Sequence, residues 1–268
     1  MKIDVATFQT VWLITFLCSA LITTALSRMF AHVGAFRFWA VGFYLLATAT
    51  ACFALHAIWH TDLLLFATAT LALQSRILIW AGTRDLFGAS APWRAGLVVT
   101  AVFSLLYGSA LAWDAPLLVR ASLLALFFAP CRAATLYEVY RRRRPQLGPA
   151  RMLVALGSAI ATLNAIVPLV LVALDRANMT LLYGNPRTTS VVYAVVFAGD
   201  LLLTVGLIVM ALRQLIVERD MLATLDRGAL ERLAESREMR GLRDSHSPRG
   251  DMLGHDAPTQ RQSLPGTV

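Results

Sequence analysis

Long uninterrupted runs of apolar residues dominate this chain. Each of seven stretches is long enough to cross the roughly 30 Å hydrocarbon core of a bilayer as a helix, which takes about 20 residues. The runs are continuous instead of alternating, and lipid cannot satisfy an open backbone, so helices are expected. The pattern predicts an all-α, polytopic membrane protein with seven transmembrane helices, at residues 8–27, 38–59, 63–82, 95–113, 116–137, 152–174 and 189–212.

The pattern changes after the seventh run. Residues 213–240 predict a cytoplasmic linker helix, because apolar residues recur there at heptad spacing over barely two heptads. A coiled coil shows three or four heptads, so a short dimer contact and a helix lying on the membrane surface both stay open. Residues 241–268 are polar and rich in Gly, Pro, Ser and Asp, and we expect them to be disordered. The predicted organisation is a seven-helix domain at 1–212 followed by this helix and tail.

Composition and charge exclude the main soluble classes. Of the 268 residues, 57% are hydrophobic and 15% are charged, against about 25% charged in typical soluble domains. The net charge of +8 lies wholly in residues 1–212, in short loops between apolar runs. That placement fits the rule that cytoplasmic loops of membrane proteins are basic, and it favours no nucleic-acid partner.

The loop charges predict an orientation. With the N-terminus outside and the C-terminus in the cytoplasm, ten arginines fall on the cytoplasmic side and four basic residues on the outer side. The ten include Arg132, which we place near the inner end of the fifth span, where a long side chain can reach the interface. They also include the run Arg141, Arg142, Arg143 and Arg144, which we interpret as a topology anchor at the lipid bilayer.

Polar residues inside the spans form the main candidate site. Asp200 and Arg76 lie about 17 Å and about 20 Å from the outer ends of the seventh and third spans, at 1.5 Å per residue. Asn164 and Gln74 fall at similar depth. Because an intramembrane charge is costly and needs a partner, we predict a central Arg76–Asp200 pair with the two amides as neighbours. This cluster is either a ligand, proton or relay site or a polar lock that fixes helix packing.

A second candidate lies at the outer end of the second span. His56 and His60 are four residues apart, on one helical face, and Asp62 follows. Two imidazoles and a carboxylate are ligands that a metal ion accepts. The spacing lacks the glutamate of the HExxH signature, so the residues are weak metal candidates, and we expect no metal and no cofactor.

Motifs of soluble catalysis are missing. The chain has no GxSxG, no Walker A loop and no GxGxxG, and the seventh span has no lysine for a retinal Schiff base. We therefore expect no catalytic residue and no enzyme activity.

Two short motifs resemble a known family. Trp39 and Gly42 form a Trp-x-x-Gly pattern, and Gly82, Arg84 and Gly88 form a Gly-x-Arg-x-x-x-Gly pattern after the third span. The pair of patterns resembles the membrane-embedded sensor regions of bacterial diguanylate cyclase (GGDEF-type) signalling proteins. The 213–240 helix resembles the segment that leads into a GGDEF domain and its opening signature.

The resemblance implies a membrane input module in a bacterial inner membrane, related to cyclic-di-GMP signalling, with the catalytic domain missing or truncated. Only 48 residues follow Asp220, and none carries the GG[DE]EF loop. From this we expect a sensor or anchor that signals through the seventh span to the cytoplasmic helix, as a homodimer with a cytoplasmic signalling partner. The alternative is a small-solute transporter or channel that uses the mid-membrane Arg/Asp/Asn site.

Overall fold

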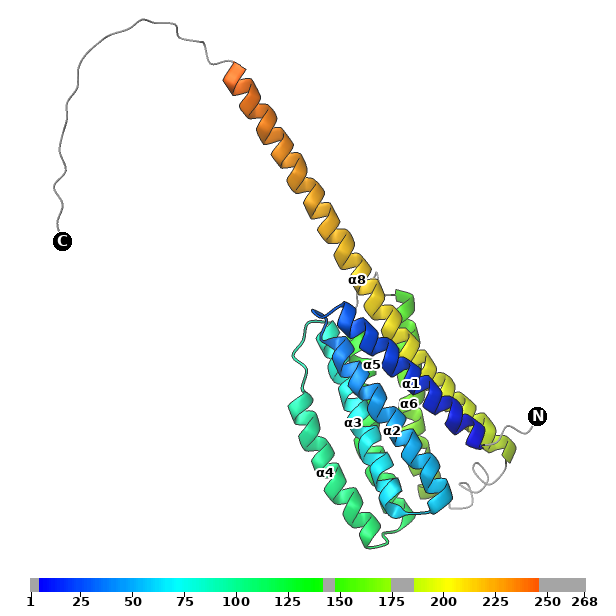
Figure 1. The fold of residues 1–268 in the computed structure, drawn as a ribbon. Coiled ribbons are helices and arrows are strands. Elements are labelled where there is room, and N and C mark those ends of the chain that lie inside the picture. Colours follow the sequence, from blue (N-terminus) through cyan, green and yellow to red (C-terminus); the bar gives the residue numbers. More distant parts are fainter. Residues whose placement is uncertain (1–4, 142–147, 175–185, 246–268) are drawn as a thin grey trace, which may run out of the picture. The chain divides into compact units, whose positions relative to one another are not determined.

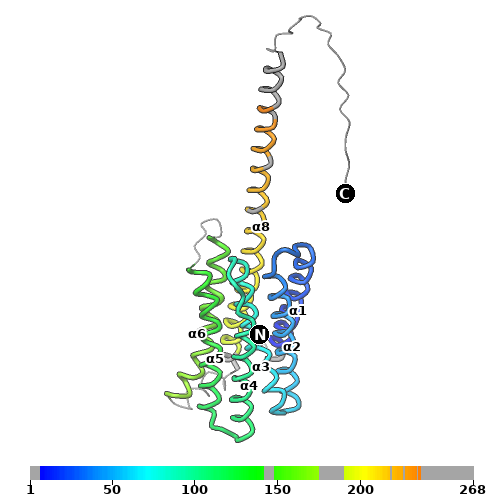
Figure 2. The backbone as a smooth tube through the Cα atoms, turned by 90° about the vertical axis from the view of Figure 1, so that its left-hand side faces the viewer, coloured from blue at the N-terminus to red at the C-terminus, as the bar shows by residue number. Residues whose placement is uncertain are grey.

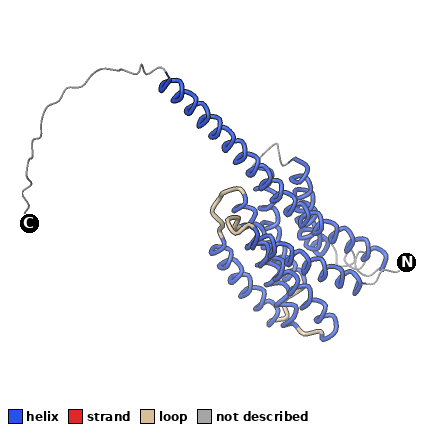
Figure 3. Tube along the Cα trace, turned by 45° about the horizontal axis from the view of Figure 1, so that its top comes forward, coloured by secondary structure: helices blue, strands red, loops and turns tan. Residues whose placement is uncertain are grey.

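The computed structural model describes residues 5–141, 148–174 and 186–245, and over those residues every element is an α-helix, with no strand (Figure 3). Seven of the described helices are long and apolar enough to cross a membrane, which confirms the prediction of an all-α, polytopic protein. In chain order the helices are α1 (Val5–Met29), α2 (Ala35–Trp59), α3 (Asp62–Leu86), α4 (Trp93–Ala112), α5 (Leu117–Arg141), α6 (Gly148–Leu174) and α8 (Pro186–Ser245).

The chain divides into two compact units, Met1–Ile216 and Val217–Val268. The helix α8 belongs to both, because it continues without a break across the boundary. The helix predicted after the seventh span is present, but α8 stays helical to Ser245, so the prediction of disorder is wrong for residues 241–245. A single glycine costs a helix only about 1 kcal/mol, and the neighbouring Arg, Met and Leu are good helix formers. The rest of the predicted tail, 246–268, lies outside the described residues.

Within the first unit, α3 packs against α2, α4 and α5. In both ribbon and tube views α3 lies between α2 and α4 (Figures 1 and 2). The helix α1 packs on α2, and α5 packs on α6. The core sits where these helices meet, and it buries Trp39, Phe36 and Phe43 of α2 completely. Many leucines and valines elsewhere are exposed, such as Leu105 of α4 at 75%, as expected of a surface that faces lipid chains.

The contact between α2 and α3 depends on one tryptophan and one glycine. The indole N–H of Trp39 donates to the carbonyl oxygen of Ile79 at 3.1 Å, and the side chain is fully buried. A Cβ on Gly82 would lie only 2.6 Å from the Trp39 ring. The ring therefore fills space that only glycine leaves open, and its N–H is satisfied inside the bundle, as buried tryptophan requires.

The helices α6 and α8 approach each other backbone to backbone. A Cβ on Gly157 would lie 2.5 Å from the amide nitrogen of Leu203 and 2.6 Å from the carbonyl oxygen of Gly199. Glycines at helix interfaces are typical of membrane bundles, where close backbone contact replaces the hydrophobic driving force. This contact fixes the membrane part of α8 against α6.

We predict that Gly157→Ala destabilises the first unit, because the added methyl meets backbone atoms that cannot move aside. Overpacking of this kind costs about 1–3 kcal/mol. The measurement is thermal melting of the purified protein in detergent, and we expect a lower midpoint than in the wild type. Gly228→Ala is the matched control, because a Cβ there meets nothing within 4 Å and alanine favours a helix. An unchanged midpoint for Gly157→Ala would refute the close packing of α6 and α8.

Candidate functional site

A buried ion pair joins α3 to α8. The Arg76 Nη2 atom lies 2.7 Å from Asp200 Oδ1, and the two residues are 5% and 7% exposed. The pair that the depth argument predicts is therefore present in the structure. A second bond stiffens the turn that holds the carboxylate, because the hydroxyl of Thr204 donates to the carbonyl oxygen of Asp200 at 2.8 Å.

Because the pair is buried, it adds little net stability while it is intact, but the loss of either partner is costly. Two charges in a low-dielectric interior attract each other strongly, but each has lost its hydration. The net stabilisation over an apolar pair is therefore small, while removal of one partner leaves an uncompensated charge and costs about 3–5 kcal/mol. The pair consequently specifies the register of α3 against α8 more than it adds stability.

Arg132 of α5 is the residue that the sequence analysis misplaces. It is predicted near the inner end of the fifth span, with its side chain reaching the interface. Instead its Nη1 atom donates to the carbonyl oxygen of Ala161 on α6, and its guanidinium lies over the ring of Phe128, 5.6 Å from the centroid. The reason is that α5 continues to Arg141, about 13 Å of helix beyond Arg132, so that Arg132 lies well inside the bundle.

Arg132 and Arg76 line the same small cavity. Its volume is about 10 Å³, and Thr135, Ser158 and Leu203 are also in its lining. A cavity of that size has barely room for one water molecule. Two guanidinium groups, those of Arg76 and Arg132, therefore lie close together, and the Arg76 group is paired with the carboxylate of Asp200.

The two amides that the sequence analysis places beside the pair have contacts of their own. The hydroxyl of Thr100 on α4 donates to Gln74 Oε1 at 2.6 Å, so Gln74 links α3 to α4. Gln74 and Arg76 are two residues apart, and such residues point to different sides of a helix. Asn164 of α6 lines a larger cavity of about 360 Å³, together with Arg132. Gln74 is thus bonded to α4, and the placement of Asn164 beside the pair stays a prediction.

Two further polar contacts involve the C-terminal end of α3. Arg84 of α3 lies against Glu138 of α5, with Nε 3.4 Å from Oε1, and Glu138 is buried. The side-chain amide of Gln214 on α8 donates to the carbonyl oxygen of Leu86 at 2.9 Å. Sequence reasoning misses both, although Arg84 belongs to the Gly-x-Arg-x-x-x-Gly pattern and Glu138 is an acid close to a predicted span end.

The histidine candidates do not assemble a metal site. The rings of His56 and His60 have centroids 6.3 Å apart, and His56 Nδ1 lies 2.9 Å from the carbonyl oxygen of Thr61. Asp62 is exposed at the start of α3. Among the described residues no group of three His, Cys, Asp or Glu side chains is placed to hold a metal ion.

The arginine run is described only at its first residue. Arg141 is exposed at the end of α5, with its guanidinium over the ring of Tyr137, 5.9 Å from the centroid. Arg142, Arg143 and Arg144 lie outside the described residues, so their interpretation as a topology anchor stays a prediction.

Comparison of the chain with known protein families, with curated proteins and with solved structures found no match.

We predict that Asp200→Ala lowers the yield of monodisperse protein in detergent and its melting temperature, because Arg76 is left without its counter-charge. The expected loss is about 3–5 kcal/mol. The double variant Arg76→Met/Asp200→Leu should recover most of it, since it buries no charge.

Asp114→Ala is the matched control, because it breaks the Arg120–Asp114 pair, in which the Asp114 side chain is exposed. Exposed pairs contribute about 0–1 kcal/mol. Normal yield and melting of Asp200→Ala would contradict the structural role of the buried pair.

Proposed function

We propose that this chain is an integral membrane sensor module that relays a change in helix packing through α8 to a cytoplasmic helix. The observation that carries the proposal is the continuity of α8. One uninterrupted helix contains Asp200, which is bonded to α3 in the middle of the first unit, and continues as the helix of the second unit to Ser245. A displacement of the membrane part of α8 therefore has a continuous helix through which to reach the second unit.

Two side-chain contacts couple α8 to the central helix α3. Asp200 holds Arg76 in the middle of α3, and Gln214 holds the Leu86 carbonyl at its inner end. Signalling transitions use helix shifts of about 1–2 Å between discrete packing arrangements. A stimulus that weakens or strengthens the Arg76–Asp200 pair acts directly on the equilibrium between such arrangements.

The resemblance to diguanylate cyclase sensor regions enters this proposal through the residues of its two motifs. Trp39 and Gly82 pack into each other, and Arg84 lies against Glu138. Gly88 has φ +72° and ends α3, where the amide of Ala89 donates to the carbonyl oxygen of Arg84 at 3.0 Å. These motif positions thus serve helix packing around α3, as a sensor region requires, and we assign the chain no catalytic activity of its own.

The space beside the ion pair favours a relay over a carrier. A transporter that bound its solute on Arg76 and Asp200 needs room for that solute next to them. The cavity there has a volume of about 10 Å³, which is the lower limit for one water molecule. Transport of a solute past this pair therefore requires a larger rearrangement of the helices than the relay of a packing change does.

A homodimer is part of the proposal. The helix of the second unit exposes several leucines, among them Leu222 at 60% and Leu225 at 70%. Pairing of two such helices buries leucines at heptad spacing. A cytoplasmic signalling partner remains the alternative occupant of the same leucines.

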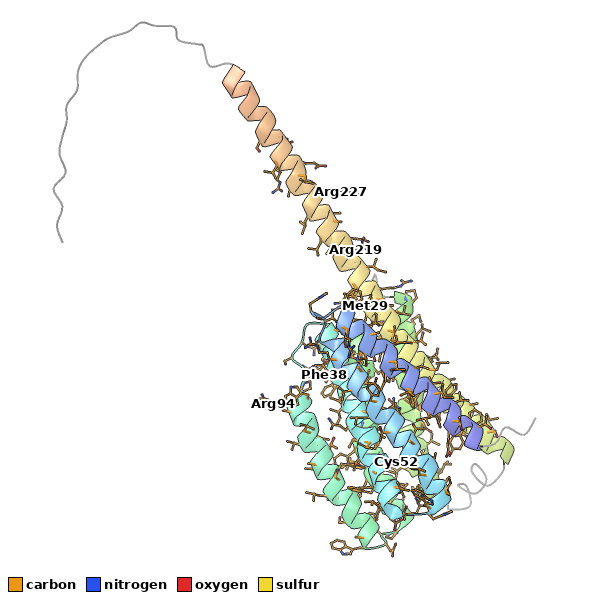
Figure 4. The ribbon with its side chains drawn as sticks, in the orientation of Figure 1. Met29, Phe38, Cys52, Arg94, Arg219 and Arg227 are labelled. Carbon is orange, nitrogen blue, oxygen red and sulfur yellow. The ribbon has the colours of Figure 1, made fainter. Side chains whose placement is uncertain are left out.

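We place the protein in a bacterial inner membrane with the N-terminus outside. Arg28, Arg37, Arg84 and Arg94 belong to the ends of α1, α2, α3 and α4 at which the α1–α2 and α3–α4 connections lie. Figure 4 shows Met29, Phe38 and Arg94 near that end of the first unit and Cys52 farther along it. A basic end is the cytoplasmic one.

We predict that a relay chimera responds to the ion pair. A diguanylate cyclase domain is fused after Leu233, and Asp200→Asn is compared with the wild type at matched protein level in the membrane. Coupling free energies of about 1–3 kcal/mol correspond to roughly fivefold or larger changes, and we expect a change of that size in cyclic-di-GMP output. Asp114→Asn should leave the output unchanged. Equal output from all three chimeras would refute the relay.

We predict that reporter fusions in a bacterial host find Ser245 in the cytoplasm and Asp114 on the outer side of the membrane. Green fluorescent protein fused after Ser245 should be fluorescent, because it folds in the cytoplasm, and alkaline phosphatase fused there should be inactive. The same phosphatase fused after Asp114, in the connection between α4 and α5, should be active. The opposite result at both sites would reverse the assignment.

A further inference from the structure

A cavity of about 360 Å³ lies among α3, α4, α5 and α6, in the half of the first unit nearer to the α4–α5 connection. Its walls are mainly apolar and aromatic, with contributions from Leu65, Leu117, Leu124, Phe128 and Pro168. The volume falls within the roughly 300–1,000 Å³ range of sites for small organic ligands.

The charged residues in the described lining of the cavity are basic. Arg120 and Arg132 are its ionisable basic groups, and no Asp or Glu belongs to the lining that the structure describes. Arg120 has Asp114 at 3.2 Å, but the carboxylate is exposed and lies outside the cavity. Arg132 donates to the neutral carbonyl oxygen of Ala161. The Nε atoms of both arginines are buried and have no hydrogen-bond partner among the described residues.

The two arginines lie on one helix, twelve residues apart, which corresponds to about 18 Å along α5. Arg132 therefore lies at the deep end, near the middle of the bundle, and Arg120 lies near the start of α5. Asn164 joins the lining and adds an amide donor. An apolar wall with a cationic deep end matches a ligand with an apolar body and one anionic head.

We propose that this cavity binds an amphipathic carboxylate, with the head group on the guanidinium of Arg132 and the apolar body against α5 and α6. Guanidinium and carboxylate form charge-assisted, planar hydrogen bonds, which are stronger than the bond to a carbonyl oxygen. Binding also neutralises an intramembrane charge that is otherwise costly. The carboxylate has two chemical sources, a fatty acid from the bilayer or a water-soluble acid with an aromatic or aliphatic body.

Arg132 connects this cavity to the Arg76–Asp200 pair. Its side chain also lines the small cavity that Arg76 lines, and Arg76 and Asp200 act on it electrostatically. An anion on Arg132 offsets the repulsion between the two guanidinium groups and competes with Asp200 for positive charge. The role of this ligand as the stimulus of the relay rests on the proposed function. Its binding depends on the cavity alone.

The binding test uses the full chain in nanodiscs of phosphatidylcholine, with dodecanoate, dodecanol and 4-phenylbutyrate as probes in equilibrium dialysis. We expect saturable binding of a carboxylate at one site per chain and at least about tenfold weaker binding of dodecanol, which lacks the charge. Dodecanoate binding alone assigns the bilayer source, and 4-phenylbutyrate binding alone assigns the soluble source. Failure of both acids to bind, or equal binding of dodecanoate and dodecanol, would overturn the site.

Arg132→Gln should weaken carboxylate binding at least about tenfold, while the matched variant Arg94→Gln, at an exposed arginine outside the cavity, should bind as the wild type does. If Arg132→Gln does not fold, Ala121→Phe tests the same site by filling the cavity, of which Ala121 is a lining residue. Wild-type affinity in a folded Arg132→Gln or Ala121→Phe variant would refute the assignment.

The bound acid should also change the output of the cyclase chimera, and Arg132→Gln should abolish that response. Binding without a change in output would refute the acid as the stimulus and leave the site intact. Absence of binding, with an output that still depends on Asp200, would refute the site and leave the relay intact.

Discussion

A charge inside a hydrocarbon layer is costly unless a polar partner satisfies it, and this constraint organises the centre of the protein. Arg76 and Asp200 belong to helices that are far apart in sequence, and their contact sets one register of α3 against α8. Three further long-range side-chain bonds end on the same helix, since Trp39, Thr100 and Gln214 all bond to α3. The bundle is thus built around a central helix that is bonded to α2, α4 and α8 through different residues.

Glycine sets how close the neighbours come. Trp39 fits over Gly82 on one side of α3, and the backbones of α6 and α8 touch at Gly157. These contacts replace the hydrophobic driving force, which is lost where lipid is as apolar as the helix surface. The ion pair and the glycine contacts act on the same segment of α8, because Gly199 precedes Asp200. A change at the ion pair therefore acts on the segment of α8 that packs closely against α6.

The sequence predicts the spans well, because only a helix satisfies its own backbone over a long apolar run. It also predicts the Arg76–Asp200 pair, because two unpaired charges at equal depth leave few alternatives. Equal depth does not determine the direction of a side chain, which is why Gln74 bonds to α4 and Asn164 lines a separate cavity. Arg132 is misplaced because α5 extends beyond the apolar run that defines the predicted span.

The central claim is that the Arg76–Asp200 pair holds α8 in one position against α3. The most direct measurement is the distance between spin labels at Leu63→Cys on α3 and Val191→Cys on α8, both exposed positions, in a cysteine-free protein in nanodiscs. The account predicts a single narrow distance distribution with Asp200 present and a broader or shifted one with Asp200→Asn. Identical distributions in the two proteins would contradict it.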